Sequence, residues 1–416
     1  MTALIFTLML SVVGALIQSA CVQAAKSRER VDVQMALEST FAEYHSKLLE
    51  TYEIFARHGS EEVIVRRLSY YGAGGMGHSL IKAEYLTDNG GMPFYRQAVK
   101  YMKDWYGADG INPDEVTLFE EGTEEEEEQE VLAQLESLLE QEEAELSSEG
   151  NPIESVKKLK ESHLLNLLLE HPEELSDRSV EPESLPSHRQ LQEGNTTVEE
   201  KDGVAERLLF TAYLAEHFGS KAKQDDSHAL LYEQEYLLGG YATDRENLEA
   251  VCRKIIALRM VVNCAYLMSS SQRQAEAEAM AAGMCTLLTV PQITDLVKLG
   301  ILFAWGYGES IVDMRLLLKE KKVPLIKNDE NWQLQLANLV KLGTEEEQVE
   351  EKEAESGISY RVYLSGLLLL ESRESLCMRS LDLIERNLNL KTDECYTTVK
   401  IQTKATDTFQ TTFGYQ

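Results

Sequence analysis

The sequence predicts a mainly α-helical fold of the α+β class, with a small β element at the C-terminus. Two observations support this prediction. Apolar residues recur every three or four positions through most of the second half, which is the period of one helix face. Residues 397–403 instead place Thr397, Val399, Ile401 and Thr403 at every second position, the period of a strand, and residues 408–415 could return as a second strand.

The composition is strongly acidic. The 416 residues include 71 Asp and Glu against 40 Lys and Arg, so the formal net charge is −31. This charge argues against nucleic acid as a partner, because a phosphate backbone attracts basic surfaces. With 43% hydrophobic residues the chain can bury a core, and its length predicts two or three domain-sized units.

Most of the charge lies in three tracts. Residues 120–149, 170–202 and 344–355 carry −14, −7 and −6, which leaves −4 for the rest of the chain. Because like charges repel and remain solvated, we expect these tracts to be exposed insertions that are dispensable for folding. Apolar residues at helical spacing within 131–139 predict a helix inside the first tract.

The first 25 residues predict a transmembrane segment. They contain no charged side chain, and residues 3–17 are apolar apart from Thr7 and Ser11. The main alternative is a signal peptide cleaved after Val22-Gln23-Ala24, which is an acceptable small-x-small site. A lipid anchor on Cys21 is disfavoured, because Gln18 occupies a position that should be aliphatic.

The residues after this segment favour its retention. An apolar stripe with helical spacing follows, and no Gly or Pro interrupts residues 16–57, so one helix is expected to run from the membrane into the soluble part. The stripe comprises Leu37, Phe41, Tyr44, Leu48, Tyr52 and Phe55.

The remaining elements follow from local patterns. Val63-Ile64-Val65 and Ser69-Tyr70-Tyr71 predict strands, and Pro93 opens a helix that ends at Gly107. Prolines at 172, 182 and 186 predict a linker. Further helices are expected over 153–169, 204–218, 230–238, 245–268, 271–288, 291–318, 360–370 and 376–388.

These elements give an expected domain organisation. A transmembrane segment (1–25) is followed by an N-terminal α+β region (26–119) and by an acidic helical insertion with a disordered linker (120–203). A helical domain (204–390) with an acidic loop (343–357) and a β tail (391–416) complete the chain.

The sequence carries no convincing motif for catalysis or cofactor binding. The glycines of 72–77 formally fit G-x-G-x-x-G, but Arg66 and Arg67 precede them where a central parallel strand should be apolar, so a turn is the better interpretation. The sequence contains no P-loop, H-E-x-x-H, C-x-x-C or G-x-S-x-G pattern. We therefore predict no catalytic, cofactor-binding or metal-binding residues and no cofactor.

Single residues have structural interpretations that compete with functional ones. The six cysteines are expected to be free, with a Cys377–Cys395 bridge as the best exception. His45 beside the apolar stripe is expected to be a partly exposed surface residue. Four side chains could either line a groove for a partner helix or belong to the core, namely Tyr266, Met268, Trp305 and Tyr307.

Several segments together resemble a known family. They are the apolar segment 8–22, FAEY at 41–44, LLE at 48–50, TDNGG at 87–91, FYRQAVKYMK at 94–103, YEQEYLL at 232–238, AWGYGES at 304–310 and KVPLIK at 322–327. The chain resembles uncharacterised membrane-anchored proteins, a domain of unknown function, of Gram-positive anaerobic bacteria. These proteins look like companions of tight-adherence (Tad) pilus systems, with a TadE/TadG-like N-terminus. Related chains usually begin with a basic residue, which this chain lacks.

The resemblance implies a location and an assembly context. It implies a single-pass protein of the cell membrane with a cytoplasmic N-terminus, the bulk of the chain outside, and pilus or surface-system proteins as partners. The expected function is therefore a non-enzymatic structural or assembly component. The alternatives are an exported surface-binding protein with a cleaved signal peptide and an enzyme of unrecognised type.

Overall fold

The structure, a computed structural model, describes residues 2–107, 152–161, 163–194, 203–288, 293–344, 347–349, 352–354 and 356–415. The chain divides into two compact units, each built from separate stretches. Unit 1 comprises Met1–Gly110, Glu181–His217 and Ser372–Gln416, and unit 2 comprises Ile111–Val180 and Phe218–Glu371. This division differs from the consecutive domains expected from the sequence, because the β tail belongs to the same unit as the N-terminal region. The helix expected within 131–139 lies outside the described residues.

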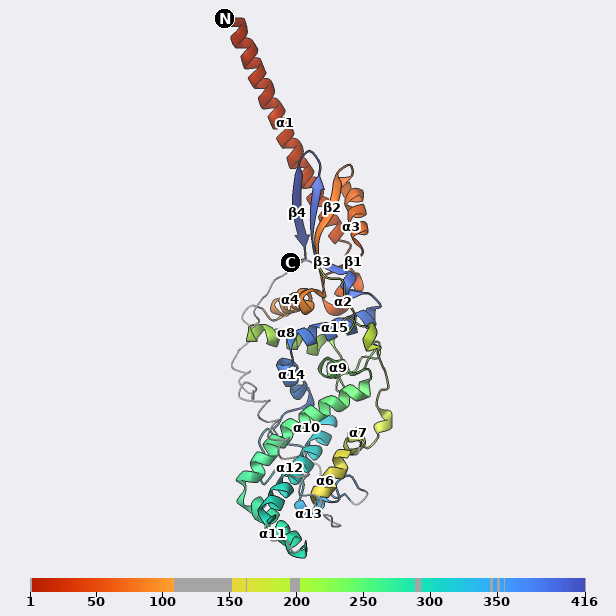
Figure 1. Cartoon of the computed structure of the whole chain (residues 1–416), viewed down its shortest axis with the longest axis vertical. Coiled ribbons are helices and arrows are strands. Elements are labelled where there is room, and N and C mark those ends of the chain that lie inside the picture. The colour runs from red at the N-terminus through yellow and green to blue at the C-terminus, as the bar shows by residue number, and fades with distance from the viewer. Residues whose placement is uncertain are drawn as a thin grey trace. The chain divides into compact units, whose positions relative to one another are not determined.

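Unit 1 contains a small antiparallel sheet, as the sequence predicts for the C-terminal strands (Figure 1). Its strands are β1 (Arg57–His58), β2 (Gly77–Tyr85), β3 (Cys395–Lys404) and β4 (Thr408–Gly414). The central strand β3 pairs with β2 on one edge, where Leu80 faces Ile401, and with β4 on the other, where Ile401 faces Thr411. The β tail is therefore paired with the N-terminal region, because β3 bonds to both β2 and β1.

Helix α1 (Thr2–Phe41) packs on this sheet through its C-terminal part only. Val33, Ala36, Leu37 and Phe41 recur at helical spacing and are buried against the sheet. The Phe41 ring meets the edges of neighbouring rings on β3 and β4, with its centroid 5.7 Å from that of Tyr396 and 4.9 Å from that of Phe413.

The expected single helix through residue 55 ends earlier than predicted. The chain turns after Phe41, and the short helix α2 (Ser46–Tyr52) begins again at residue 46. His45 causes this second start, because its Nδ1 accepts a hydrogen bond from the Leu48 backbone N–H and so caps α2. The apolar stripe is thus shared by two helices.

The strand prediction for residues 63–65 is wrong, because they lie in helix α3 (Glu61–Leu68). Ile64 and Leu68, four residues apart, are buried on one face, which overrides the strand preference of the Val-Ile-Val run. Residues 69–71 are not a strand either, since they lie in the single π-helical turn η1 (Ser69–Ala73). The glycines that follow form the turn into β2, as expected.

The other helices of unit 1 surround α4 (Asp88–Tyr106), which packs against α8 (Val204–His217) and α15 (Arg373–Leu388). Helix α4 ends before Gly107 as predicted, and its regular part begins beside Pro93 as predicted, because Asn89, Gly90 and Gly91 at its start have left-handed backbone angles. Gly91 has φ +82°, and a Cβ there would lie 2.6 Å from Cβ of Cys377. The TDNGG segment is therefore a close-packed left-handed turn.

Unit 2 is helical and is organised around the neighbouring helices α10 (Asp244–Ser269) and α12 (Thr294–Leu318). Gly306 lets them approach, because a Cβ at this position would lie 2.6 Å from Sγ of Cys264. The other helices are α6 (Pro152–Glu161), α7 (Leu164–Leu168), α9 (Glu233–Gly239), α11 (Ser271–Leu288), α13 (Leu336–Leu339) and α14 (Tyr360–Leu370).

The segment expected to be a disordered linker is largely ordered. Residues 163–194 are described and include the short 3₁₀ turns η5 (Pro172–Glu174) and η6 (Pro182–Ser184). Leu175, Val180 and Leu185 are buried, and Arg189 pairs with Glu385 and Asp393 at 2.6 and 2.5 Å. Acidic residues dominate this segment, so its buried apolar residues were not recognised from the sequence. Because these residues are buried, the expectation that the segment is dispensable for folding is not supported.

Candidate functional site

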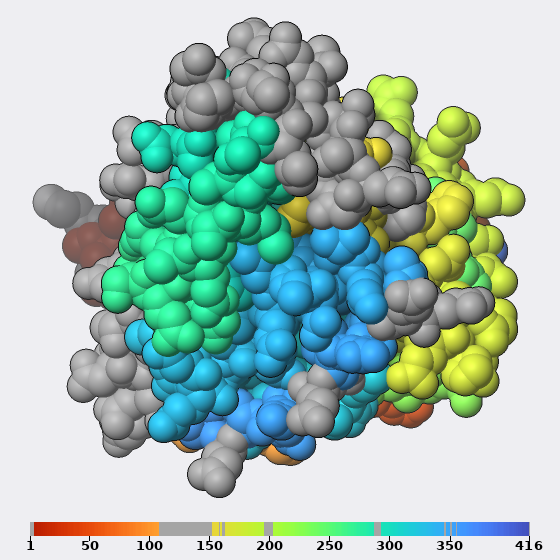
Figure 2. All heavy atoms as spheres, turned by 90° about the horizontal axis from the view of Figure 1, so that it is seen from below, coloured from red at the N-terminus to blue at the C-terminus, as the bar shows by residue number. Residues whose placement is uncertain are grey.

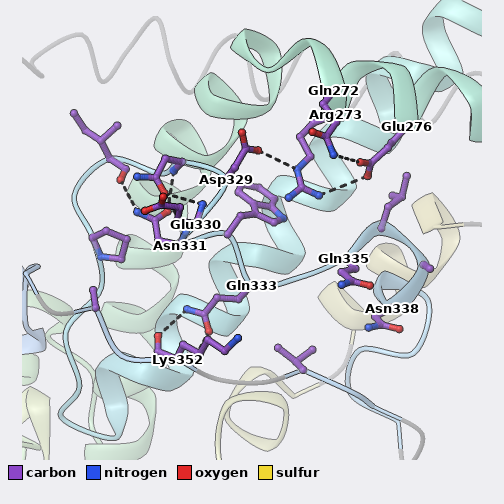
Figure 3. Close-up of a pocket in the computed structure, with 18 of the residues that line it drawn as sticks. Gln272, Arg273, Glu276, Asp329, Glu330, Asn331, Gln333, Gln335, Asn338 and Lys352 are labelled. Carbon is purple, nitrogen blue, oxygen red and sulfur yellow. Dashed lines mark hydrogen bonds and ion pairs between the residues drawn. The ribbon is translucent and has the colours of Figure 1, made fainter.

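Unit 2 carries an open groove of about 1680 Å³. Its walls come from α11, from the segment that follows α12, and from residues 347–349, 352–354 and 356 (Figure 3). Figure 2 shows the corresponding face, with α10 and α11 in green beside the blue spheres of the segment after α12. Because the groove is formed by sequence-distant segments, its shape depends on how the segment 323–335 is held.

A buried cluster of charged side chains holds the segment 323–335 against α10 and α12. Glu309 and Asp313 lie one turn apart on α12, and Arg259 and Asn263 lie one turn apart on α10. Lys327 Nζ lies 2.5 Å from Oε1 of Glu309 and 2.8 Å from Oδ1 of Asp313. Arg259 donates from Nε and NH2 to Oδ2 of Asp313, at 3.0 and 2.9 Å. The two acidic and two basic side chains balance in charge, as burial requires.

The same cluster fixes the backbone of the groove wall. The Glu309 carboxylate accepts hydrogen bonds from the backbone N–H groups of Gln333 and Leu334, at 3.0 and 2.7 Å. Arg259 NH1 donates to the Pro324 carbonyl at 2.9 Å. The segment is therefore attached to the helices at both of its ends, without regular secondary structure of its own.

Aromatic packing completes the wall. The indole N–H groups of Trp305 and Trp332 both donate to the Leu334 carbonyl, at 2.7 and 2.6 Å. The Arg273 guanidinium lies 5.1 Å from the ring centroid of Trp305 and 5.9 Å from that of Trp332. Trp305 is fully buried, so the structure favours the core interpretation of this residue over a role in a partner groove.

Polar side chains that line the groove form hydrogen bonds with the backbone of the segments that line it. Asn331 Oδ1 accepts from the Asn328 N–H at 2.8 Å, and Gln333 exchanges hydrogen bonds with the backbone of Lys352 in both directions (Figure 3). Burial raises the pKa of Glu309, and Lys327 opposes this shift. Because Glu309, Asp313 and Lys327 are buried, their charged groups face one another and the backbone of the groove wall.

The second functional feature is the N-terminal part of α1 in unit 1. Every side chain of residues 4–25 is exposed, and the first half-buried one is Lys26. The helix is long and apolar enough to cross a membrane over this part, and none of its most apolar window is buried. By length and composition a signal sequence would have the same character. The structure thus places the end of the apolar segment and the start of the folded unit next to each other.

The other sequence candidates have structural roles. The glycines of 72–77 lead into β2, and His78 at their end bonds to the Ala73 carbonyl and to Thr403 Oγ1. None of the six cysteines forms a disulfide, so Cys377 and Cys395 are not bridged. Among the described residues, no group of three or more His, Cys, Asp or Glu side chains could hold a metal ion.

The buried charge cluster was not predicted from the sequence. A signal was available, because Glu309 and Asp313 share one face of α12 and are the only charged residues between Lys298 and Arg315. Charged residues on an apolar helix face are rarely buried unless they are paired. Their partners could not be identified, since Arg259 and Lys327 lie 54 and 14 residues from Asp313 in the sequence.

The fold and these features define a mainly helical protein with one candidate membrane span among its described helices. Residues 141–408 match a family of unknown function (DUF5702), and the chain belongs to this family. The match includes both helices of the charge cluster and strand β3, but only the first residue of β4 and no part of α1. No curated protein matches the chain, and no solved structure matches it.

Proposed function

We propose that the protein is a single-pass, membrane-anchored structural or assembly component of a tight-adherence pilus-like surface system, with its large part outside the cytoplasm and without enzymatic activity. One observation carries the proposal: the apolar, exposed part of α1 and its packed part form one uninterrupted helix. The proposed membrane anchor and a core helix of unit 1 are therefore parts of the same helix.

The packing of α1 supports a mechanical role for the anchor. Its C-terminal part is covered by a core of Leu37, Phe41 and the β3 residues Val399 and Ile401. The Tyr415 hydroxyl, beyond β4, donates to the Phe41 carbonyl at 2.5 Å. A force on unit 1 would therefore reach the membrane through a helix that is held by the sheet, as an assembly component requires.

The proposed location and partners rest on the sequence resemblance. The resemblance of segments such as FAEY at 41–44 and YEQEYLL at 232–238 to companions of tight-adherence systems supports an extracytoplasmic, assembly-linked protein. The charge cluster supports a non-enzymatic role, because its acidic and basic groups pair with one another inside the fold.

Affinity purification of the detergent-solubilised full chain from its native membranes tests the proposal. Other components of a pilus-like surface system should co-purify. The matched control is a chain in which a cleavable signal peptide replaces residues 1–24. Recovery of the same partners at the same yield without the span would contradict a role that depends on anchoring.

One observation favours the second candidate, an exported surface-binding protein. All residues of α1 that are buried against the sheet lie after the possible cleavage site at Ala24, so a cleaved chain would keep this core. The N-terminus of the mature protein distinguishes the two candidates.

A further inference from the structure

One end of the unit 1 sheet is tied to α1 immediately after the apolar segment. The turn that joins β3 to β4 carries Thr406 and Asp407. Lys26 Nζ lies 3.1 Å from Oδ2 of Asp407, and the Glu29 carboxylate accepts hydrogen bonds from Thr406 N and from Thr406 Oγ1, the latter at 2.5 Å. The turn is thus attached to α1 at two points. Figure 1 shows this end of the hairpin beside α1.

A third contact extends this attachment along the hairpin. The Arg30 guanidinium lies 5.6 Å from the ring centroid of Phe409, near the start of β4. Gly77 pairs with Lys404, so the start of β2 lies at the same end of the sheet. We name residues 26–32 of α1 together with residues 404–409 the hairpin collar.

The position of the collar matches the surface of a bilayer. Residues 4–25, all exposed, would extend about 33 Å as a helix at about 1.5 Å per residue, close to the roughly 30 Å of a hydrocarbon core. The collar begins at the next residue, Lys26. A helix that fills the hydrocarbon with this segment therefore brings the collar to the level of the lipid headgroups.

The charge of the collar differs from that of the whole chain. It contains four basic residues, Lys26, Arg28, Arg30 and Lys404, and three acidic ones. The acidic ones have partners within the collar: Asp407 has Lys26, Glu29 has Thr406, and Asp32 lies 4.0 Å from Arg28. Arg28 remains 85% exposed and Lys404 is exposed, so basic groups face outward in a chain of net charge −31.

We infer that the hairpin collar docks on the headgroups of anionic phospholipids, with Arg28 and Lys404 contacting their phosphates. The inference rests on the proposed function, because it requires α1 to span the membrane. Basic side chains next to a span gain energy from an anionic surface. Since the collar belongs to both α1 and the sheet, docking would fix the distance of the sheet end from the membrane.

The test measures the depth of three positions in the full chain, reconstituted into vesicles. Cys21→Ala removes the exposed native thiol, and the other five cysteines are buried. A fluorophore is then placed on Ala405→Cys in the collar, on Thr412→Cys further along β4, or on Val12→Cys in the span. Quenchers are attached either to lipid headgroups or to acyl chains, in vesicles of phosphatidylcholine with or without phosphatidylglycerol.

The inference predicts that headgroup quenching at position 405 exceeds that at position 412 and increases with phosphatidylglycerol. The Arg28→Gln/Lys404→Gln variant should lose most of this lipid-dependent increase, whereas Arg28→Lys/Lys404→Arg should keep it. Equal quenching at 405 and 412, or an increase unaffected by the glutamine variant, would overturn the inference while leaving the anchor intact.

Two further outcomes are separable from these. If the probe at position 12 is not quenched from the acyl chains, the anchor itself fails and the docking fails with it. If shielding at position 405 instead depends on the number of chains per vesicle, a second copy of the chain covers the collar, which also overturns the inference.

Discussion

Lys327 and Asp313 form an ion pair of 2.8 Å in which neither side chain is exposed to solvent. Lys327 reaches this position from a segment without regular secondary structure, and it also contacts Glu309 at 2.5 Å. The pair therefore links a groove wall to the centre of the α10–α12 helix pair. Removing either charge would leave the buried cluster of Arg259, Glu309, Asp313 and Lys327 with one uncompensated charge.

Lys327→Met should destabilise unit 2 by about 3–5 kcal/mol, because Glu309 and Asp313 would then share only Arg259 as a buried cation. Chemical denaturation followed by circular dichroism measures this loss. Lys298→Met is the matched control, since the partner of Lys298, Glu278, is 61% exposed, and its effect should stay within about 1 kcal/mol. Equal stability of the two variants would show that the cluster does not hold the fold.

The stability of unit 2 should fall as the pH rises from about 4.5 to 7. Burial raises the pKa of Glu235 from its ordinary 4.5 to about 7, against hydrogen bonds from Lys221 N–H and the Tyr360 hydroxyl. The folded state thus keeps a proton that the unfolded state loses in this window. The free energy of unfolding decreases with rising pH, by about 3 kcal/mol over the window.

Glu235→Gln tests this pH dependence, because the amide stays neutral at every pH. Its unfolding free energy, measured at a series of pH values, should lack the Glu235 contribution to the slope. Glu249→Gln on the surface of α10 is the control and should retain the slope of the native chain. An unchanged slope in Glu235→Gln would mean that this carboxyl is ionised in the folded protein.

Arg189→Gln should destabilise unit 1 by about 2 kcal/mol. Its guanidinium serves Glu385 and Asp393, and all three side chains are less than one fifth exposed, so the variant leaves two largely buried carboxylates near each other. Lys103→Gln breaks the more exposed pair with Glu206 and should cost less than about 1 kcal/mol. If thermal unfolding does not separate the two variants, residues 181–194 do not contribute to the core as their burial indicates.

The proposed topology predicts labelling from outside the cell. In a Cys21→Ala background, a membrane-impermeant maleimide should react with Thr412→Cys in intact, wall-stripped cells. The basic residues Lys26, Arg28 and Arg30 would by themselves favour a cytoplasmic position, but Glu29 and Asp32 alternate with them, and long domains cross membranes largely regardless of such charges. Labelling that requires lysis would place the domain inside and contradict the pilus-assembly proposal.

The helices were predictable because each carries its own apolar period. The expected range 360–370 coincides with α14, and 271–288 coincides with α11. The errors occurred where tertiary contacts decide the local structure. Residues 63–65 have strand-forming side chains, yet burial of Ile64 and Leu68 on one face makes them helical.

The candidate sites were less predictable than the fold. The apolar N-terminal segment is local and visible in the sequence. The charge cluster combines Arg259, Asp313 and Lys327 from two helices and a loop, so only the three-dimensional structure brings them together. The hairpin collar likewise joins Lys26 to Asp407 over 381 residues of sequence.

The central claim is that α1 is retained as a membrane anchor. Mass spectrometry of the N-terminal peptide of the protein extracted from native membranes tests this claim most directly. If α1 is a retained anchor, the N-terminal peptide of the membrane-bound chain should still contain the apolar residues 4–25, and the protein should resist extraction by alkaline carbonate. A mature chain that begins at Ala25 and is released by carbonate would contradict the account.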